Sequence, residues 1–254
     1  ANRIAHHLGA QGIGVGDHIG IYAQNCHEWI ETMLGCFKLR AIPINVNFRY
    51  VSDELAYIFN NADLVGLVFD DQYAPLVTEI RDKAPRLKAF VHVHTGIGDD
   101  GADVSSDLAA LGSVSYEDAT VDQSGSRDGL PGDRSPDDLY VLYTGGTTGM
   151  PKGVMNTHRS LQTFCAHYTI SCTYLAEEKI VNLAAAPMTH TAGILSLPAT
   201  SRGGTVVVVT KPDPTILLAA IPRYKVTEFF LPPTVIYRLL DIPNLKSKVD
   251  FSSL

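Results

Sequence analysis

Short apolar runs alternate with helical patterns along most of this chain of 254 residues. Residues 19–23, 41–45, 64–69, 89–93, 139–143, 180–185, 205–209 and 226–231 read as strands, and helical segments separate most of them. Neighbouring parallel strands need a long crossover such as a helix, whereas a hairpin needs only a tight turn. The alternation therefore predicts an α/β fold of mostly parallel sheets flanked by helices, built from layered βαβ units.

The expected helices have recognisable start signals. Asn25, Ser52 and Thr157 are candidate N-caps, because their short polar side chains can accept a hydrogen bond from the first turn. The last helix is expected to start at Pro232-Pro233-Thr234, with proline in its first turn. The helices should cover residues 26–39, 52–61, 73–83, 158–174, 192–201, 214–223 and a stretch from 233 onward.

Residues 95–138 break the pattern. Glycine, serine, aspartate and proline dominate this stretch, which is therefore expected to be an acidic surface connection, interrupted by a short element near residues 108–111. The adjacent acids Asp70-Asp71, Asp99-Asp100, Asp137-Asp138 and Glu177-Glu178 are interpreted as solvated charges. His92 and His94 share one face of a strand but have no third ligand nearby, so a structural role is expected.

The charge and cysteine content exclude several classes of protein. The formal net charge is −7, so nucleic acid is a poor candidate partner. The four cysteines form no C-x-x-C pair, which favours buried thiols in a reducing compartment and predicts a cytoplasmic location. No apolar run approaches the roughly 18 residues that cross a bilayer, so no transmembrane segment is expected.

The most informative segment runs from Tyr143 to Val154 and reads Y-T-G-G-T-T-G-M-P-K-G-V. Glycines let the backbone come close to a ligand, and successive N–H groups can then surround an anion. Threonine hydroxyls add donors, and Lys152 supplies a positive charge for phosphate. The loop is not a Walker A motif, because Pro151 precedes the lysine and Gly153 follows it. The composition suits a polyphosphate.

This segment resembles the phosphate-binding signature of the adenylate-forming (AMP-binding) superfamily, Y-T-S-G-T-T-G-x-P-K-G-V. That superfamily contains acyl-CoA synthetases, luciferases and the adenylation domains of peptide synthetases. The chain departs from the signature only at Gly145, which replaces serine. Residues 16–21, 37–45, 226–234 and 250–254 also resemble family segments, although Arg40 occupies a usual glycine position. The resemblance implies a truncated large N-terminal domain of such an enzyme.

A second motif distinguishes branches of the superfamily. Residues 186–193, A-P-M-T-H-T-A-G, resemble the P-L-x-H-x-x-G of the acyl-CoA synthetase (fatty-acid–CoA ligase) branch. Peptide-synthetase domains carry F-D-x-S there, with an aspartate for the amino group of the substrate. This chain has His190 and no carboxylate, so a carboxylic acid without an α-amino group fits better. Taken alone, a histidine between a strand and a helix favours a hydrogen-bonded structural role, whereas within this motif His190 is expected to act in the site.

The resemblance implies a reaction in two halves, in which a carboxylic acid and ATP give an acyl-adenylate and coenzyme A then displaces AMP. The expected partners are the acid, ATP with Mg²⁺, and coenzyme A, and the sequence leaves a homo-oligomer open. Gly145 is found among family ligases for bulky or branched acyl groups, including steroid side chains. The phosphates are expected to bind Thr144, Gly145, Gly146, Thr147, Thr148, Gly149 and Lys152.

The remaining roles follow from the same resemblance. Thr148 is expected to touch Mg²⁺, Lys152 and His190 to act in catalysis, and His190 with Gly193 to contact the acid. Residues 1–158 would form a first α/β subdomain that includes the phosphate-binding loop, and residues 159–254 an incomplete second one. A C-terminal domain would be absent, so the 254 residues alone are expected to be inactive.

Two alternative functions stay open from the sequence. One is another adenylate-forming enzyme, either a luciferase-like oxygenase or an adenylation domain that loads a carrier protein. The other is a non-catalytic nucleotide-binding module that keeps the loop without the reaction. Dependence of pyrophosphate exchange on an acid, followed by dependence on coenzyme A, would separate these alternatives.

Overall fold

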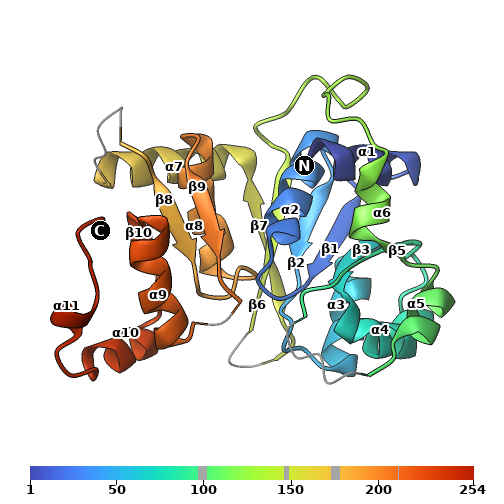
Figure 1. Ribbon diagram of the computed structural model, residues 1–254. Helices are drawn as coiled ribbons and strands as arrows, with labels where there is room; N and C mark the ends of the chain where they lie inside the picture. The colour runs from blue at the N-terminus through green and yellow to red at the C-terminus, as the bar shows by residue number, and fades with distance from the viewer. Residues whose placement is uncertain (97–101, 146–148, 173–177, 211) are drawn as a thin grey trace. The chain divides into compact units, whose positions relative to one another are not determined.

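The computed structural model describes residues 1–96, 102–145, 149–172, 178–210 and 212–254 (Figure 1). The chain forms two compact units, Ala1–Ser160 and Leu161–Leu254, which are described here one at a time as the first and the second unit. Both are α/β structures with mostly parallel sheets, as the alternating pattern predicts.

The first unit contains a seven-stranded sheet in the order β5-β4-β3-β1-β2-β6-β7. Its strands are β1 (His18–Tyr22), β2 (Ile42–Asn45), β3 (Leu64–Asp70), β4 (Ala89–Val93), β5 (Val114–Ser115), β6 (Leu139–Thr144) and β7 (Lys152–Thr157). All neighbours pair in parallel except β6 and β7, which form an antiparallel hairpin. Because parallel strands end at the same edge, the carboxyl ends of β1 to β6 lie together.

Helices cover both faces of this sheet. They are α1 (Asn2–Ala10), α2 (His27–Leu39), α3 (Ser52–Asn61), α4 (Ala74–Ile80), α5 (Ser105–Leu111) and α6 (Tyr116–Val121), with 3-10 turns η1 (Asp71–Tyr73) and η2 (Arg81–Lys83). One core packs α3, α4 and α5 on the sheet, and a second core packs α1, α2 and α6 on the opposite face (Figure 1). All residues of β3 are buried, since it lies between these two layers.

The acidic stretch 95–138 is more structured than its composition indicates. It contributes α5, β5 and α6, and β5 extends the sheet by pairing with β4. Leu111, Tyr116 and Ala119 are buried in the two cores, and these few apolar contacts hold an otherwise polar segment. Residues 97–101, which include Asp99 and Asp100, lie outside the described residues.

The second unit is built on a three-stranded parallel sheet in the order β10-β8-β9. Its elements are β8 (Val181–Ala184), α8 (Thr191–Ser201), β9 (Thr205–Val208), α9 (Pro214–Tyr224), β10 (Glu228–Phe229), α10 (Pro233–Leu240) and α11 (Leu245–Lys248), and α7 (His158–Ser171) leads into it. Its core packs Leu183 and Ala185 with apolar residues of α9 and α10, including Leu217, Ile221 and Leu239.

Several expected element starts need correction. The helix predicted after Asn25 begins at His27, with Cys26 as the N-cap, and the helix predicted from Ser52 has Val51 before its first turn. Glu54 carries the capping contact there, because its Oε2 accepts a hydrogen bond from the Val51 N–H at 3.2 Å. Thr157 does cap α7, accepting from the Ser160 N–H at 3.1 Å.

Of the expected solvated acids, one is buried and another is partly buried in an ion pair. Asp70, at the carboxyl end of β3, is only 1% exposed, and Thr95 donates a hydrogen bond to it. Burial raises the pKa of the Asp70 carboxyl. Asp138 is the second case and is described with the site below. Among the described residues, no helix is long and apolar enough to cross a membrane.

Candidate phosphate loop and acyl site

The predicted phosphate loop connects the two strands of the β6–β7 hairpin. Thr144, the last residue of β6, pairs directly with Lys152, the first residue of β7. Residues that face each other in an antiparallel pair project from the same face of the sheet, with Cβ atoms roughly 5 Å apart. The hydroxyl of Thr144 and the ammonium group of Lys152 therefore start from the same side of the loop. Both residues are exposed to solvent.

The glycines of the loop differ in their surroundings. Gly145 and Gly149 are exposed, and a Cβ added at either position would meet no atom within 4 Å. Their lack of a side chain leaves open space in which a ligand can reach the backbone. Gly146, Thr147 and Thr148 lie outside the described residues, so their predicted contacts with phosphate and Mg²⁺ stay predictions.

Gly153 has a different role, because it faces Tyr143 across the hairpin. A Cβ at position 153 would lie 3.0 Å from Val141 Cγ1 and 3.2 Å from the Tyr143 ring. Such distances are shorter than ordinary side-chain contacts, so the absence of a side chain leaves room for Val141 and the Tyr143 ring of the neighbouring strand β6.

Two tyrosines fasten β6 to the rest of the first unit. Tyr140 accepts a hydrogen bond from Asn45 Nδ2 at 2.8 Å, and Tyr143 donates to Asn61 Oδ1 at 2.6 Å. Burial raises the pKa of Tyr143 to about 12, so its phenol stays protonated and keeps this donor. The strand that leads into the loop is thereby fixed on both faces.

The base of the hairpin is held by an ion pair that local sequence patterns did not predict. Arg40 follows α2 in the left-handed conformation, with φ 58°, which suits the glycine usual at this position. Its Nε and Nη2 atoms bind the Asp138 carboxylate at 2.8 to 3.2 Å, and Asp138 immediately precedes β6. The Arg40 guanidinium holds the pKa of Asp138 below its usual range.

Next to this ion pair lies His158, the first residue of α7. Its ring meets the ring of Phe37 edge-on, with centroids 4.5 Å apart, and its Nε2 is buried without a partner among the described residues. Burial lowers the pKa of His158; Asp138 opposes this effect, whereas Arg134 and Arg40 add to it. The imidazole is therefore favoured in its neutral form.

In the second unit, His190 and Gly193 come together at the start of α8. His190 is the N-cap, and Gly193 lies in the first turn, where N–H groups have no partner within the helix. The helix follows β8, so this end lies at the carboxyl edge of the sheet. A helix N-terminus in such a place favours a carboxylate or phosphate group.

Thr189, directly before His190, was not singled out by its sequence. It is 2% exposed, and its Oγ1 has no hydrogen-bond partner among the described residues. Ser196, in the second turn of α8, is fully buried and donates to the Gly193 carbonyl at 2.6 Å. The sequence does not show that these two hydroxyls are buried or that only one of them has a partner; the packing of the folded chain does.

The two histidines at the end of β4 each have a hydrogen-bond partner; His92 lies in β4 and His94 directly follows it. His92 Nδ1 lies 3.0 Å from Ser113 Oγ, and His94 Nδ1 lies 2.7 Å from Asp71 Oδ2. Within the described parts of the chain, no group of three or more histidine, cysteine, aspartate or glutamate side chains could hold a metal ion.

Comparison with known proteins finds acid–CoA ligases that are similar to this chain. The chain is 48% identical over 161 residues to the 3-oxocholest-4-en-26-oate–CoA ligase of Rhodococcus rhodochrous, a match that covers 63% of this chain and 27% of that enzyme. It is 35% identical to a medium/long-chain-fatty-acid–CoA/3-oxocholest-4-en-26-oate–CoA ligase of Mycolicibacterium smegmatis, covering 100% of this chain and 48% of that enzyme. The chain thus spans at most about half the length of these relatives.

A solved structure supports the fold. The crystal structure of an anthranilate CoA ligase in complex with anthranoyl-AMP matches with a TM-score of 0.81 at 24% identity, covering 100% of this chain and 47% of that protein. The family model described as AMP-binding enzyme matches residues 1–254. The family predicted from the loop is thereby confirmed, and this chain belongs to the AMP-binding enzymes.

Proposed function

We propose that this chain carries the phosphate loop and part of the acyl site of an ATP-dependent acid–CoA ligase. The complete protein would join a carboxylic acid to AMP with release of pyrophosphate, and then transfer the acyl group to coenzyme A. The pairing of Thr144 with Lys152 at the two ends of the glycine-rich loop is the observation that carries this proposal. It puts a hydroxyl donor and an ammonium group on one side of a loop whose described glycines, Gly145 and Gly149, are exposed.

The loop fits the triphosphate of ATP better than a dedicated metal cage. Its residues offer N–H groups, hydroxyls and one ammonium group, all of which bind phosphate oxygens. Mg²⁺ is commonly held by substrate phosphates and few protein groups, so one hydroxyl ligand from Thr148 would suffice on this chain. Bound Mg²⁺ would neutralise charge on the phosphates.

The residues of this chain would then act as follows. Backbone N–H groups of Gly145, Gly146 and Gly149, with the hydroxyls of Thr144, Thr147 and Thr148, would hold the β- and γ-phosphates. Lys152 would offset the negative charge that grows on pyrophosphate as it leaves the α-phosphorus. Fixed donors of this kind stabilise the transition state more than the ground state when they face the developing charge.

His190 and Gly193 would serve the acid. The N-terminal turn of α8 would orient the carboxylate that attacks the α-phosphorus, and His190 would line the place where the coenzyme A thiol later attacks the acyl carbon.

The substrate class follows from the relatives. Two ligases named for 3-oxocholest-4-en-26-oate match this chain at 48% and 47% identity, and the second is also named for medium- and long-chain fatty acids. We therefore propose a bulky or long apolar acid, in agreement with Gly145 in the loop. The subdomains 1–158 and 159–254, a homo-oligomer and a cytoplasmic location stay predictions.

The test is acid-dependent exchange of labelled pyrophosphate into ATP by the complete protein that contains this chain, with Mg²⁺ present. The proposal expects exchange with long-chain or steroid acids and, on addition of coenzyme A, formation of the thioester. Exchange without any use of coenzyme A would indicate a carrier-loading or luciferase-like enzyme. Binding of ATP without exchange for any acid would indicate a non-catalytic nucleotide-binding module.

A further inference from the structure

The β6–β7 hairpin extends past the strand that supports it. The last residue pair between β2 and β6 joins Asn45 to Leu142, and β2 ends there. In the described ladders, the next two residues of β6, Tyr143 and Thr144, pair only with β7, which is itself the edge strand of the sheet. Residues 143, 144, 152 and 153, called the hairpin end below, therefore lie beyond the part of the sheet in which β6 has paired neighbours on both sides.

One side chain ties the hairpin end to the helices below the sheet. Tyr143 is 3% exposed and belongs to the core that α3, α4 and α5 form with the sheet. Its hydroxyl donates to Oδ1 of Asn61, the last residue of α3, at 2.6 Å. Its ring lies against Gly153, where an added Cβ would come within 3.2 Å of two ring atoms. Tyr143 thus meets β7 through its ring and α3 through its hydroxyl.

These contacts lie directly behind the pair of residues that is proposed to meet phosphate. Successive residues of a strand point to opposite faces, so Thr144 projects from the face opposite to Tyr143. Lys152 faces Thr144 across the ladder and projects from the same face as Thr144. A displacement of Tyr143 therefore moves Thr144 through the backbone of β6 and Lys152 through Gly153.

The hydrogen bond from Tyr143 to Asn61 sets where the phenol ring lies. Without the amide oxygen of Asn61, the hydroxyl loses this acceptor and the ring is held by apolar contacts alone, which have no preferred direction. Donors that are held in place before a ligand arrives need not be ordered when it binds. The order of the hairpin end is therefore expected to affect how well the loop binds an anion.

We infer that Asn61 is a positioning residue for the phosphate loop, and that it acts through Tyr143 to hold Thr144 and Lys152 in place for the triphosphate of ATP. The inference rests on the proposed function, because it assumes that this loop binds the triphosphate. Asn61 itself touches no substrate in this role. Its loss should therefore weaken the use of ATP and leave the use of the acid unchanged.

The test measures KM for Mg·ATP and KM for the acid separately, by acid-dependent pyrophosphate exchange with the complete protein that contains this chain. Calorimetry gives the affinity for Mg·ATP alone. Asn61→Leu removes the acceptor, Tyr143→Phe removes the donor, and Asn61→Asp keeps an acceptor oxygen at the same position. Tyr116→Phe is the matched control, because Tyr116 is a buried tyrosine on the opposite face of the sheet whose hydroxyl donates to Glu31 Oε2 at 2.9 Å.

We expect Asn61→Leu and Tyr143→Phe each to raise KM for Mg·ATP by about 3- to 10-fold, the range that corresponds to one lost hydrogen bond. KM for the acid should stay the same. The double variant should be no worse than either single one, because all three lack the same bond. Asn61→Asp should retain most of the affinity for Mg·ATP. Tyr116→Phe should lower the melting temperature and leave both KM values unchanged.

An unchanged KM for Mg·ATP in Asn61→Leu and Tyr143→Phe would overturn the inference. A lower exchange rate with both KM values unchanged would overturn it too, since that is the result of a smaller folded fraction. If Tyr143→Phe does not fold, Asn61→Leu decides, because Asn61 is exposed. Failure of the unaltered protein to activate any acid would instead reject the proposed function, and the affinities of the same variants for Mg·ATP would still decide the inference.

Discussion

Thr144 and Lys152 face each other across the first pair of the β6–β7 ladder, one on each side of the glycine-rich loop. The same arrangement explains why an otherwise parallel sheet has an antiparallel strand, β7, at its edge. A hairpin returns the chain at once, so both ends of the loop are fixed by one set of hydrogen bonds. Of the described loop residues, Gly145, Gly149 and Met150 are exposed, while the two ends of the loop stay in place.

Lys152→Met should reduce acid-dependent ATP–pyrophosphate exchange by about 10- to 100-fold, because a charge-assisted contact with phosphate is lost. Lys152 is exposed, so the melting temperature should not change. Lys246→Met removes an exposed lysine of α11 and is the matched control. Full exchange activity in Lys152→Met would contradict the phosphate role, and Lys152→Arg should retain part of the activity.

Gly153→Ala should lower the free energy of unfolding by about 1–3 kcal/mol, because the new Cβ crowds Val141 and the Tyr143 ring. Urea denaturation followed by circular dichroism measures the change. Gly132→Ala is the control, since a Cβ there meets no atom within 4 Å and the residue has no positive φ. Equal stability of both variants would show that the hairpin can relax around position 153.

The free energy of unfolding should fall as the pH is lowered from about 7.5 to about 5.5, partly because of His158. Its pKa is lowered by burial, whereas in the unfolded chain it returns to about 6.5. In this window the unfolded state binds the proton more readily, so acidification favours unfolding. His158→Gln should weaken the dependence on pH, and His167→Gln, an exposed position of α7, should not.

Thr189→Val should leave the free energy of unfolding unchanged or raise it by up to about 1 kcal/mol, because the buried hydroxyl has no partner among the described residues. Ser196→Ala should lower it by about 1 kcal/mol, since it loses the bond to the Gly193 carbonyl. Thermal unfolding of both variants provides the comparison. A marked loss of stability in Thr189→Val would mean that an internal water binds this hydroxyl.

The sequence predicted the elements whose signal is local. The strand expected at residues 89–93 matches β4 residue for residue, because a short run of buried apolar residues is recognisable without its partners. The apolar run 226–231 contributes only Glu228–Phe229 to a strand. The Val226 N–H instead bonds the Ile221 carbonyl at the end of α9, an outcome that depends on where α9 stops.

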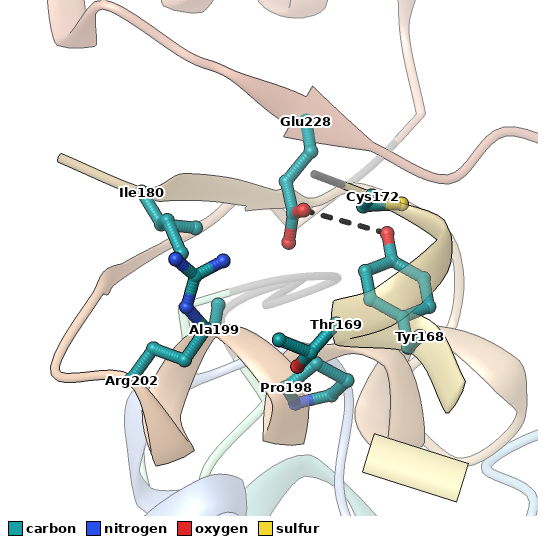
Figure 2. Close-up of a pocket in the computed structure, with 8 residues that line it drawn as sticks. All are labelled: Tyr168, Thr169, Cys172, Ile180, Pro198, Ala199, Arg202 and Glu228. Carbon is teal, nitrogen blue, oxygen red and sulfur yellow. Dashed lines mark hydrogen bonds between the residues drawn. The ribbon is translucent and has the colours of Figure 1, made fainter. Parts of the chain in front are cut away.

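In the site, too, the motifs that are continuous in sequence could be predicted, whereas contacts between distant residues could not. The glycine-rich loop and the motif around His190 are continuous in sequence, so residue types and spacing identify them. Arg40 and Asp138 are 98 positions apart, and neither lies in a pattern that indicates a partner. Arg202 and Glu228 likewise line one small pocket only after β9 and α9 have returned the chain to the same end of the sheet (Figure 2).

The ladder between β6 and β7 also limits how this region can change in length. Side chains alternate between the two faces of a strand, so a shift of one residue in pairing inverts every side chain of β7. Deleting a single residue between Gly145 and Pro151 without compensation would shift the pairing of Lys152 with Thr144 by one residue. The Lys152 ammonium group would then lie on the opposite face of the sheet. A substitution in the loop leaves this pairing in place, whereas a change in the number of loop residues alters it.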